Sequence, residues 1–520
     1  MKWNTMQHLN IVGLFVEAAE QYPDRIAIIH RGKSIRYGQL LREVRRTASY
    51  FEKKGVRKGD RVLVFIPMSI DLYRIVLALF YVGATAVFLD AWSGVKRVEE
   101  CVEIAECRGF IGHWKARLIR WLLPSARKIP LLLKLRGRGE ADGEVAAVQG
   151  EDPALITFTT GSTGRPKAAL RNHNFLRIQY EVLNGYIHPD AGDVVMTTLP
   201  IVLLVNLGVG ACSVIPDAGL HSGKSVDAGV IVDQMSRYRV SRLIASPQFG
   251  VEVATFLAGK HRSLPHLKEV YTGGGPVFSD MALQLKKGFP DAHIQVIYGS
   301  TEAEPISHIA VDQLIYLSGR QNDGLPAGEI YPGTDLRIIH TDSLHNKSYT
   351  SSEWEALCCP EGEIGEIVVA GDHVLKHYYK SPEAWRQAKI KAGSTLWHRT
   401  GDSGFVRDGQ LYLTGRVKRL IQYGSRKIAP FVVEAALRQS PGIRRAALMD
   451  TCGQLILAIE PEERSNGLKE IAGSIPHDRM ITFESIPLDP RHRTKVDYTM
   501  LEKMIQEIMD GEGILSSGRR

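Results

Sequence analysis

Apolar and polar positions along the first three hundred residues alternate between two spacings. Apolar residues recur at helical spacing near residues 12–18 and 70–81, and short apolar runs near 26–29 and 61–66 fit buried strands. Strands that alternate with helices in this way form parallel sheets covered by helices. The pattern continues to about residue 310 and predicts an α/β fold built on mostly parallel sheets.

The pattern changes towards the C-terminus. Shorter strands are predicted at 336–339, 365–370 and 410–413, and the segments between them are rich in Gly, Ser and Asp. Strands and helices alternate again near the end of the chain, with helices predicted at 430–438 and 496–509. Because a chain of 520 residues exceeds what one hydrophobic core usually supports, we expect more than one domain.

Composition and sorting signals favour a cytoplasmic globular protein. Hydrophobic residues make up 44% of the chain and charged residues 23%, which is ordinary for this class. The apolar runs at 75–89 and 199–216 are too short or too interrupted for membrane spans, so we expect buried strand and helix segments there. Residues 1–10 lack the apolar core of a secretory signal, and the six cysteines show no CxxC pair and no metal-binding spacing.

The net charge of +8 comes from one segment. Nine Lys and Arg residues and no Asp or Glu lie between Cys107 and Gly139, which leaves 56 of the 65 basic residues against 57 acidic ones. A local excess argues against a general nucleic-acid surface, and no specific nucleic acid is expected. Within it, residues 113–123 mix Trp and Leu with Lys and Arg, as interfacial helices do. Peripheral membrane contact through residues 113–138 and a surface helix with snorkelling basic side chains are the two interpretations.

A turn rich in hydroxyls and glycine, residues 157–167, is the first candidate for a binding site. Its small residues let backbone N–H groups and hydroxyls converge on phosphate oxygens, and the lysine adds a flexible positive charge. It is not a Walker A loop, because proline precedes the lysine and Ala168 follows it. The phosphate-binding candidates are Thr159, Thr160, Gly161, Ser162, Thr163, Gly164 and Lys167.

Four further segments carry groups that suit a nucleotide. Glycines at 272–276 could admit a flat base or an acyl group, and residues 298–302 offer an aromatic ring, hydroxyls and a carboxylate. Residues 398–402 end in an acid suited to ribose hydroxyls, and Gly415 and Arg416 precede the change of domain. In this order and spacing, the five segments resemble the adenylate-forming superfamily of acyl-CoA synthetases, peptide-synthetase adenylation domains and luciferases.

The resemblance covers residues 14–500 and implies a fold and a set of ligands. Residues 1–417 would form an AMP-binding and acyl-binding domain of mostly parallel sheets with covering helices plus a distorted barrel. Residues 418–520 would form a small mobile catalytic lid domain of α/β type, with its hinge at Lys418. The implied cofactors are ATP and Mg²⁺, with CoA as a further candidate.

The resemblance also implies a role for each motif. The turn would bind the β- and γ-phosphates of ATP. Glu302, with Thr159 or Thr160 nearby, would hold Mg²⁺. Thr301 would contact the α-phosphate. The other nucleotide-binding residues would be Gly273, Gly274 and Gly275 beside the base and the acyl site, Tyr298 stacked on adenine, Gly299 and Ser300 next to it, and Asp402 and Arg416 on the ribose.

Near the C-terminus, residues 487–497 resemble the family segment that carries a catalytic lysine. The resemblance places Lys495 over the carboxylate and the α-phosphate in the transition state, where its positive charge would be stabilising. The predicted catalytic residues are therefore Lys495, Glu302 and Thr301.

Two departures from the family pattern bear on the substrate and the acyl acceptor. Residues 199–205 lack the usual aromatic or histidine gate and are aliphatic, which favours a long or apolar acyl group. The family's glycine beside the pantetheine tunnel falls on Ser425, and one of its usual glutamates falls on Val432, which puts CoA in question. Phrases similar to those of the olefin-pathway β-lactone synthetases, in which the substrate's own hydroxyl displaces AMP, are residues 362–369, 397–399 and 489–492.

The sequence thus predicts an ATP-dependent ligase that converts a carboxylic acid, expected to be a fatty acid, into an acyl-adenylate. Transfer of the acyl group to CoA is the first expectation, and closure to a β-lactone or loading of a carrier protein are the alternatives. A contrasting hypothesis is an inactive basic scaffold that associates with a membrane or RNA. The five motifs in register favour the enzyme.

Overall fold

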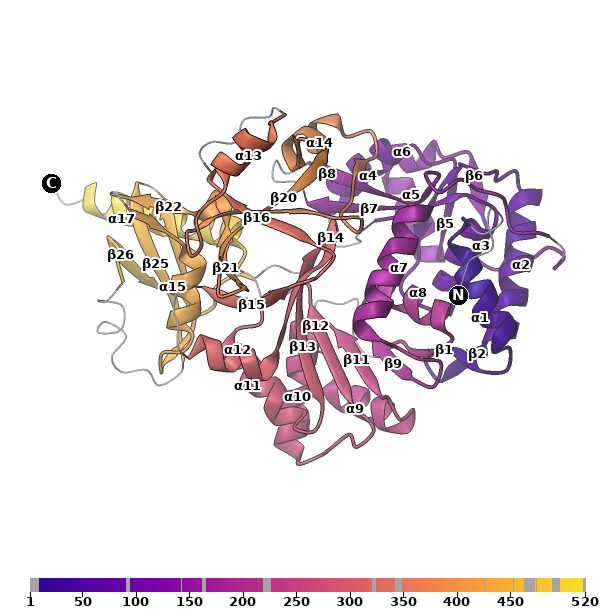
Figure 1. Ribbon diagram of the computed structural model, residues 1–520, viewed down its shortest axis with the longest axis horizontal. Coiled ribbons are helices and arrows are strands. Elements are labelled where there is room, and N and C mark those ends of the chain that lie inside the picture. The colour runs from indigo at the N-terminus through magenta and orange to yellow at the C-terminus, as the bar shows by residue number, and fades with distance from the viewer. Residues whose placement is uncertain are drawn as a thin grey trace.

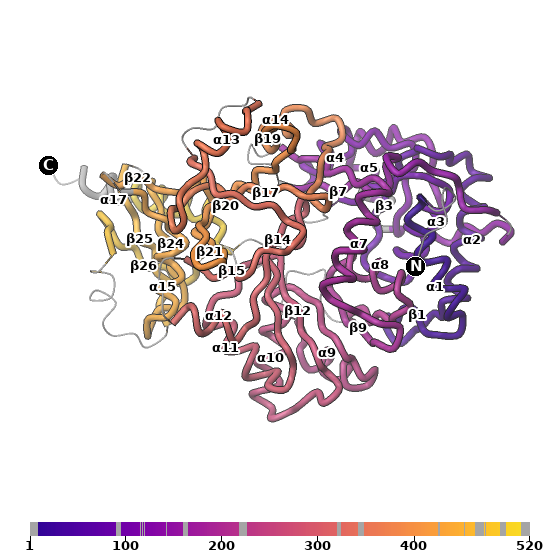
Figure 2. Tube along the Cα trace, in the orientation of Figure 1, coloured from indigo at the N-terminus to yellow at the C-terminus, as the bar shows by residue number. Residues whose placement is uncertain are grey.

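Two large sheets and a small C-terminal sheet organise the protein (Figure 1). In Figure 2 the N-terminal part, in indigo and purple, lies on the opposite side of the molecule from the C-terminal part, in yellow. The computed structural model describes residues 9–89, 94–141, 143–160, 165–217, 226–319, 324–341, 348–424, 426–451, 453–462, 473, 475–488 and 496–517.

The first sheet is parallel except at one edge. β3 pairs in parallel with β4 and β5, whereas β8 pairs antiparallel with β7 and β18. Val62, Leu63 and Val64 of β3 are buried, as the continuous apolar run of this strand requires in a sheet covered on both faces. Among the described residues its strands follow the order β18 (His377–Tyr378), β8 (Pro166–Asn172), β7 (Pro153–Thr160), β4 (Thr85–Phe88), β3 (Arg61–Phe65), β5 (Gly109–Gly112) and β6 (Leu131–Leu133).

The large sheet changes from parallel to antiparallel at the turn formed by Thr301 and Glu302. β11, β12 and β13 pair in parallel, whereas β13 and β14 are joined by these two residues and pair antiparallel. Across the described chain, its order is β16 (Asp335–Ile339), β17 (Gly365–Ala370), β20 (Thr395–Arg407), β21 (Gln410–Arg416), β15 (Leu325–Ile330), β14 (Ala303–Ala310), β13 (His293–Ser300), β12 (Glu269–Gly273), β11 (Arg242–Ala245), β9 (Val194–Thr197), β10 (Cys212–Val214), β1 (Ile26–His30) and β2 (Lys33–Arg36), with β19 (Lys389–Ala392) on β20.

The expectation of mostly parallel pairing, which concerned the chain up to about residue 310, therefore holds up to about residue 300. The later strands of the large sheet pair antiparallel. Parallel pairing needs a long crossover, so the two-residue connections within β13–β14, β19–β20 and β20–β21 require antiparallel pairing. The other antiparallel pairs among these later strands have longer connections. Among the described residues the strand order is open at β16, while β14, β15, β16, β17 and β21 contribute to one shared hydrophobic core. The distorted barrel expected for these strands stays a prediction.

Helices cover the sheets where the apolar spacing predicted them. α3 spans Ile70–Tyr81, as expected, and the Ser69 hydroxyl caps it by accepting a hydrogen bond from the Leu72 N–H at 3.3 Å. None of the helices in the described part of the chain is long and apolar enough to cross a bilayer. The N-terminal helices are α1 (Val12–Gln21), α2 (Tyr37–Lys53), α3, α4 (Gly94–Ala105), α5 (Trp114–Leu122), α6 (Pro124–Arg127), α7 (His173–Ile187) and α8 (Pro200–Val209). The middle of the chain adds α9 (Ala228–Arg237), α10 (Pro247–Lys260), α11 (Ser279–Gly288), α12 (Val311–Ser318), α13 (Ser351–Leu357) and α14 (Pro382–Ala388).

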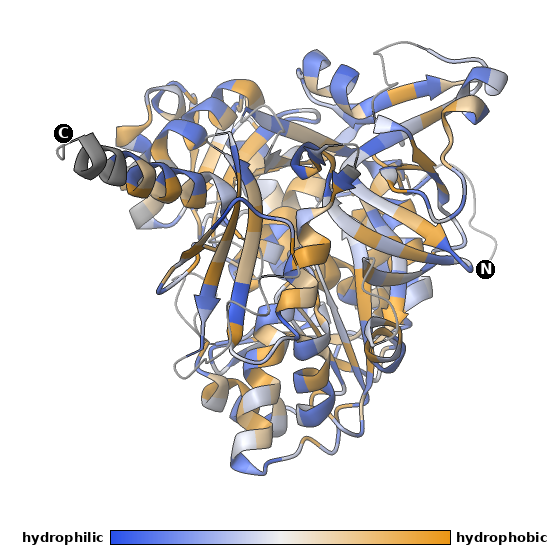
Figure 3. Ribbon diagram, turned by 90° about the vertical axis from the view of Figure 1, so that its left-hand side faces the viewer, coloured by the Kyte–Doolittle hydropathy of each residue, from blue (hydrophilic) through white to orange (hydrophobic). Residues whose placement is uncertain are grey.

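The C-terminal part begins with the short helix η2 (Val417–Arg419), which contains the predicted hinge residue. Figure 3 turns this part towards the viewer and shows hydrophobic and hydrophilic positions mixed along its helices and strands. The domain boundary at residue 418 and its mobility stay predictions. The elements are β22 (Ile421–Tyr423), β23 (Arg426–Ile428), α15 (Pro430–Leu437), β24 (Ile443–Thr451), β25 (Gln454–Pro461), β26 (Arg479–Thr482) and α17 (Tyr498–Ser517).

Candidate active site

A cleft of about 1390 Å³ lies between the two large sheets and the C-terminal part. Gly273 ends β12 close to it, where a Cβ would lie 2.7 Å from the carbonyl oxygen of Ile297. The predicted site residues that line the cleft are Thr159, Lys167, Gly274, Gly275, Tyr298, Gly299, Ser300, Thr301, Glu302, Asp402, Arg416 and Lys418. The predicted residues Gly161, Ser162, Thr163, Gly164 and Lys495, together with Ser425 and the side chain of Thr160, lie outside the described residues.

Glu302 stands at the tip of the turn between β13 and β14 and receives two hydroxyl groups. The Thr159 hydroxyl donates a hydrogen bond to its Oε1 at 3.1 Å, and the Tyr378 hydroxyl donates to the same atom at 3.3 Å. The backbone carbonyl of Glu302 accepts a hydrogen bond from the Leu375 N–H at 2.7 Å. The carboxylate is thus fixed in position at Oε1, and none of the described residues donates a hydrogen bond to Oε2, the second oxygen that a carboxylate ligand of Mg²⁺ offers.

Positive charge gathers around this carboxylate. Burial lowers the pKa of Lys167, the Glu302 carboxylate opposes that shift, and Lys418 and Arg399 lower the pKa further. The Lys167 ammonium also lies 6.0 Å from the centroid of the Tyr378 ring. Lys167, Lys418 and Arg399 stand beside two acids, Glu302 and the Glu366 that pairs with Arg399. The local excess of positive charge suits a polyphosphate.

Asp402 lies at the other polar end of the cleft. It is paired with Arg416 in the register of β20 and β21, and its Oδ1 lies 3.0 Å from the Arg416 Nε. The Tyr298 hydroxyl donates a hydrogen bond to Asp402 Oδ2 at 2.8 Å. Burial, helped by the Asp402 charge, raises the pKa of Tyr298, so this hydroxyl keeps its proton. The three residues predicted beside adenine and ribose therefore meet in one hydrogen-bonded group.

Arg171, which no motif singled out, also lines the cleft. It is 7% exposed, and its guanidinium donates hydrogen bonds to Thr157 Oγ1 at 2.7 Å and to the Thr301 carbonyl at 3.0 Å. It thereby joins β7 of the first sheet to the turn that carries Glu302. Arg399, within the predicted ribose segment, is similarly held by Glu366, whose Oε2 accepts a hydrogen bond from its Nη2 at 2.7 Å.

A buried lysine lies behind the phosphate end. Lys389 is 5% exposed, and its ammonium donates a hydrogen bond to the carbonyl of Leu375, the residue that binds the Glu302 backbone. Burial lowers the pKa of Lys389 to about 7, although the Glu302 charge acts in the opposite direction.

The variant Lys389→Met should change how stability depends on pH. An unfolded lysine loses its proton near pH 10.5, whereas folded Lys389 loses it near 7, so between these values the unfolded state binds one more proton. The wild-type protein should therefore gain stability relative to Lys389→Met as the pH rises above 7, as thermal unfolding midpoints would show. The exposed Lys391 of the same strand gives the control Lys391→Met, which should follow the wild type. Parallel pH profiles for wild type and Lys389→Met would contradict this account.

The far arm of the cleft is apolar. Leu199, Pro200, Ile201 and Leu204, all from the aliphatic segment that the sequence analysis singled out, line it. The rest of that segment is buried in the core. Side chains of α3 and of the loop before it face the same space, namely Met68, Leu72, Tyr73 and Val76.

The C-terminal part closes one side of the cleft. Leu488 and Val496 form an antiparallel bridge, and both line the cleft. Residue 495, the predicted catalytic lysine, precedes Val496 directly in the chain. Its neighbour thus lies at the cleft, while the placement of Lys495 itself stays a prediction.

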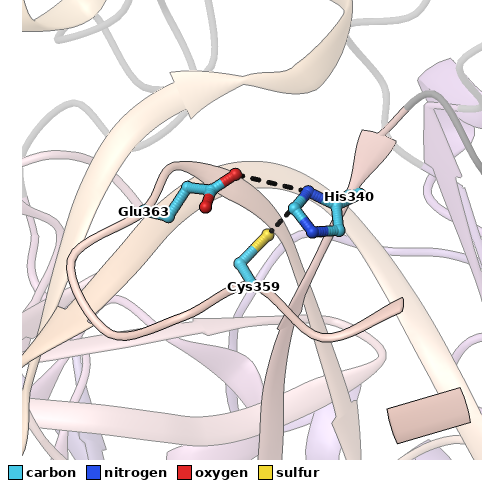
Figure 4. A group of neighbouring side chains, drawn as sticks. All are labelled: His340, Cys359 and Glu363. Atoms are coloured by element: carbon cyan, nitrogen blue, oxygen red, sulfur yellow. Dashed lines mark hydrogen bonds and ion pairs between the residues drawn. The ribbon is translucent and has the colours of Figure 1, made fainter. Parts of the chain in front are cut away.

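A second group of polar side chains lies away from the cleft (Figure 4). His340 Nδ1 lies 3.3 Å from Glu363 Oε1 and 3.4 Å from the sulfur of Cys359. The spacing of the cysteines does not reveal this group, because the bridge between Ile339 and Cys358 brings Cys359 beside His340.

Comparisons with known proteins agree with this architecture. The family model described as AMP-binding enzyme matches residues 15–379. The chain is 28% identical to the olefin beta-lactone synthetase of Xanthomonas campestris pv. campestris, over 94% of this chain and 96% of that protein. It is 24% identical to 4-coumarate-CoA ligase 1 of Narcissus pseudonarcissus, over 88% of this chain and 85% of that protein.

A solved structure shares the fold over nearly the full length. The crystal structure of ATP-bound MatB from Rhodopseudomonas palustris superposes with a TM-score of 0.79 at 20% identity, and covers 96% of this chain and 99% of that one. The mixed α/β fold expected from the sequence is thus confirmed. With 365 of its residues matched by the family model, the chain belongs to the AMP-binding enzyme family and is an adenylate-forming acid ligase.

Proposed function

We propose that the cleft activates a fatty acid with Mg²⁺ and ATP. A carboxylate oxygen attacks the α-phosphorus, the bond from that phosphorus to the bridging oxygen breaks, and pyrophosphate leaves with the electron pair. The products are acyl-AMP and pyrophosphate. The observation that carries the proposal is the division of one cleft into a polar, cationic end and an aliphatic arm.

The polar end is assigned to the nucleotide. Asp402 and Arg416 bind the ribose, and Tyr298 with the glycines 273–275 borders the adenine. Lys167 and the turn at 159–164 bind the β- and γ-phosphates, where the surplus of positive charge supports the assignment.

The chemistry is assigned to groups around the α-phosphate. Thr301 contacts that phosphate, and Lys495 approaches it from the C-terminal part. Glu302 and Thr160 hold Mg²⁺, which would neutralise the negative charge on the departing pyrophosphate. The free acceptor capacity of the fixed Glu302 carboxylate supports the metal role.

For the second step we propose the substrate's own β-hydroxyl as the acceptor. Its oxygen attacks the acyl carbon, the bond from that carbon to AMP breaks, and the hydroxyl proton passes to solvent, which leaves a β-lactone and AMP. The support is the likeness to an olefin beta-lactone synthetase and the presence of Val432 where CoA-using relatives are expected to carry glutamate. Transfer to CoA, named for the 4-coumarate ligase, and transfer to a carrier protein are the alternatives.

Pyrophosphate release with a panel of fatty acids tests the first step. Long-chain acids should release pyrophosphate with Mg²⁺ and ATP, and short polar acids should not, because only the former fill the aliphatic arm. Mass spectrometry of a 3-hydroxy acid without CoA should show a product lighter than the acid by one water. The plain acid of equal length is the control, and it should stop at acyl-AMP. A thioester that forms only when CoA is present would show that CoA is the acceptor in the second step. If no acid led to release of pyrophosphate, the proposal that the protein activates fatty acids would be contradicted.

A further inference from the structure

An apolar stripe on α5 faces solvent. Trp114 is 65% exposed, Leu118 59%, Trp121 68% and Leu122 66%. These positions are spaced by four, three and one residues, so they share one side of the helix. Large apolar side chains exposed singly are common, but four on one side of a nine-residue helix indicate a surface that binds something.

The opposite side of α5 holds the helix against the protein. Ala116 is buried there, and Leu123 and Ala126 bury the turn that follows. Arg120 donates hydrogen bonds to the carbonyls of Ala126, at 2.9 Å, and Arg127, at 2.8 Å. Because the helix is anchored by this side, the apolar stripe is turned outward by the fold itself. Figure 1 shows α5, α6 and β6 together in the upper right of the molecule.

Basic residues lie on α5 and next to it. Of the nine Lys and Arg residues between Cys107 and Gly139, three belong to α5 and two stand at the end of α6, namely Lys115, Arg117, Arg120, Arg127 and Lys128. The other four lie before β5 or after β6. Acidic side chains of α4 contact the same region, where Glu99 and Glu103 accept hydrogen bonds from Ser125. Arg108 and Arg138 form ion pairs with Asp60 and Glu43 at 2.9 and 3.0 Å. Among the basic residues of this segment whose side chains the structure describes, the exposed ones are Arg108, Arg127, Lys128, Lys134, Arg136 and Arg138.

We propose that this surface, which consists of α5 and residues 123–128, docks on an anionic lipid bilayer. The Trp and Leu side chains enter the boundary between headgroups and acyl chains, where amphipathic indole rings are favoured. The basic residues bind the lipid phosphates, since the local charge complements an anionic membrane. An RNA partner would also match the charge, but it would leave the aliphatic Leu118 and Leu122 exposed to water.

The position of the surface fits the proposed substrate, on which this part of the inference rests. α6 packs against both α5 and α4, and Arg97 of α4 lines the cleft. In the docked protein, α6 and α4 would therefore connect the membrane-bound α5 to the cleft that contains the aliphatic arm. Fatty acids partition into bilayers, so the enzyme would meet its substrate at the surface where that substrate is concentrated.

Vesicle sedimentation with the full-length protein tests the proposal. The wild type should bind phosphatidylcholine vesicles that contain about 30% phosphatidylglycerol, and raising the salt from about 0.1 M to about 1 M should weaken binding. The double variant Trp114→Ala/Trp121→Ala should bind these vesicles at least about tenfold more weakly. The control Leu283→Ala/Tyr316→Ala removes two side chains that are each 55% exposed elsewhere, and it should bind as the wild type does.

Each other outcome overturns the proposal. No binding of the wild type, equal binding to pure phosphatidylcholine, or unchanged binding of the tryptophan variant would each reject the membrane surface. Tighter binding to a homopolymeric RNA than to vesicles would assign the surface to RNA, and a dimer that dissociates in the tryptophan variant would assign it to a second copy. Pyrophosphate release from a water-soluble medium-chain acid should be equal in wild type and variant. Loss of docking with this activity retained separates the present inference from the proposed function.

Discussion

Replacing Glu302 with glutamine should lower kcat/KM for acyl-adenylate formation on the order of 10²- to 10³-fold. The amide keeps the size of the side chain and can still accept from Thr159 and Tyr378, which donate to the carboxylate. It lacks the negative charge that we assign to Mg²⁺ binding. Titration calorimetry should show that Mg²⁺ strengthens ATP binding to the wild type more than to Glu302→Gln.

The cleft offers a matched control two residues away. Glu304 lines the same cleft, and burial raises its pKa, although the charge of Arg171 opposes the shift. Because the carboxyl is already shifted towards its neutral form, Glu304→Gln should change the rate much less than Glu302→Gln. Equal losses in the two variants would show that packing, and not the metal, explains the effect, provided that both unfold at the wild-type temperature.

The variant Lys495→Ala should abolish adenylate formation, with a loss on the order of 10³-fold in a single turnover. We expect its affinity for ATP to stay within about threefold of wild type, because the proposed role of the lysine begins only as charge develops at the α-phosphate. Rapid quench with labelled ATP measures the rate of adenylate formation in a single turnover, and calorimetry measures the affinity for ATP.

Lys503 of α17 supplies the control for this variant. It is exposed and lies in the same C-terminal part, so Lys503→Ala should retain full activity. If Lys495→Ala turned over at a comparable rate, the C-terminal motif would be misaligned and another cation would have to be sought. Lys418 would then be the next candidate, since it lines the cleft.

Local spacing was sufficient for most elements. The helix predicted at 70–81 is Ile70–Tyr81, and the one predicted within 113–123 is Trp114–Leu122. Both helices follow from apolar side chains that recur on one face at helical spacing. This spacing can be recognised in a short window of sequence. The motifs around Glu302, Asp402 and Arg416 could be placed together for a different reason, namely their resemblance to a family, and the structure brings them to one cleft.

Contacts between distant segments could not be predicted in this way. The Tyr378 hydroxyl binds Glu302, which is 76 residues away in the chain, and the Arg171 guanidinium binds Thr301, which is 130 residues away. No local sequence pattern predicts either contact. Lys389 looks like any solvated lysine in the sequence, and only its burial distinguishes it. The order in which the strands beyond Glu302 pair could not be predicted, because sequence patterns reveal strands but not which strands are neighbours.

The two ends of the nucleotide site belong to different sheets. β7 and β8 lie in the first sheet, whereas β20 and β21 lie in the large one. At this seam, which is the boundary between the two sheets, side chains such as Arg171 and Thr159 connect the sheets. Within one sheet, hydrogen bonds between neighbouring strands would set the distance instead. A spacing held by side chains can be adjusted by single substitutions. Evolution could therefore retune nucleotide affinity at the seam through Arg171, to which no contact with the nucleotide is assigned.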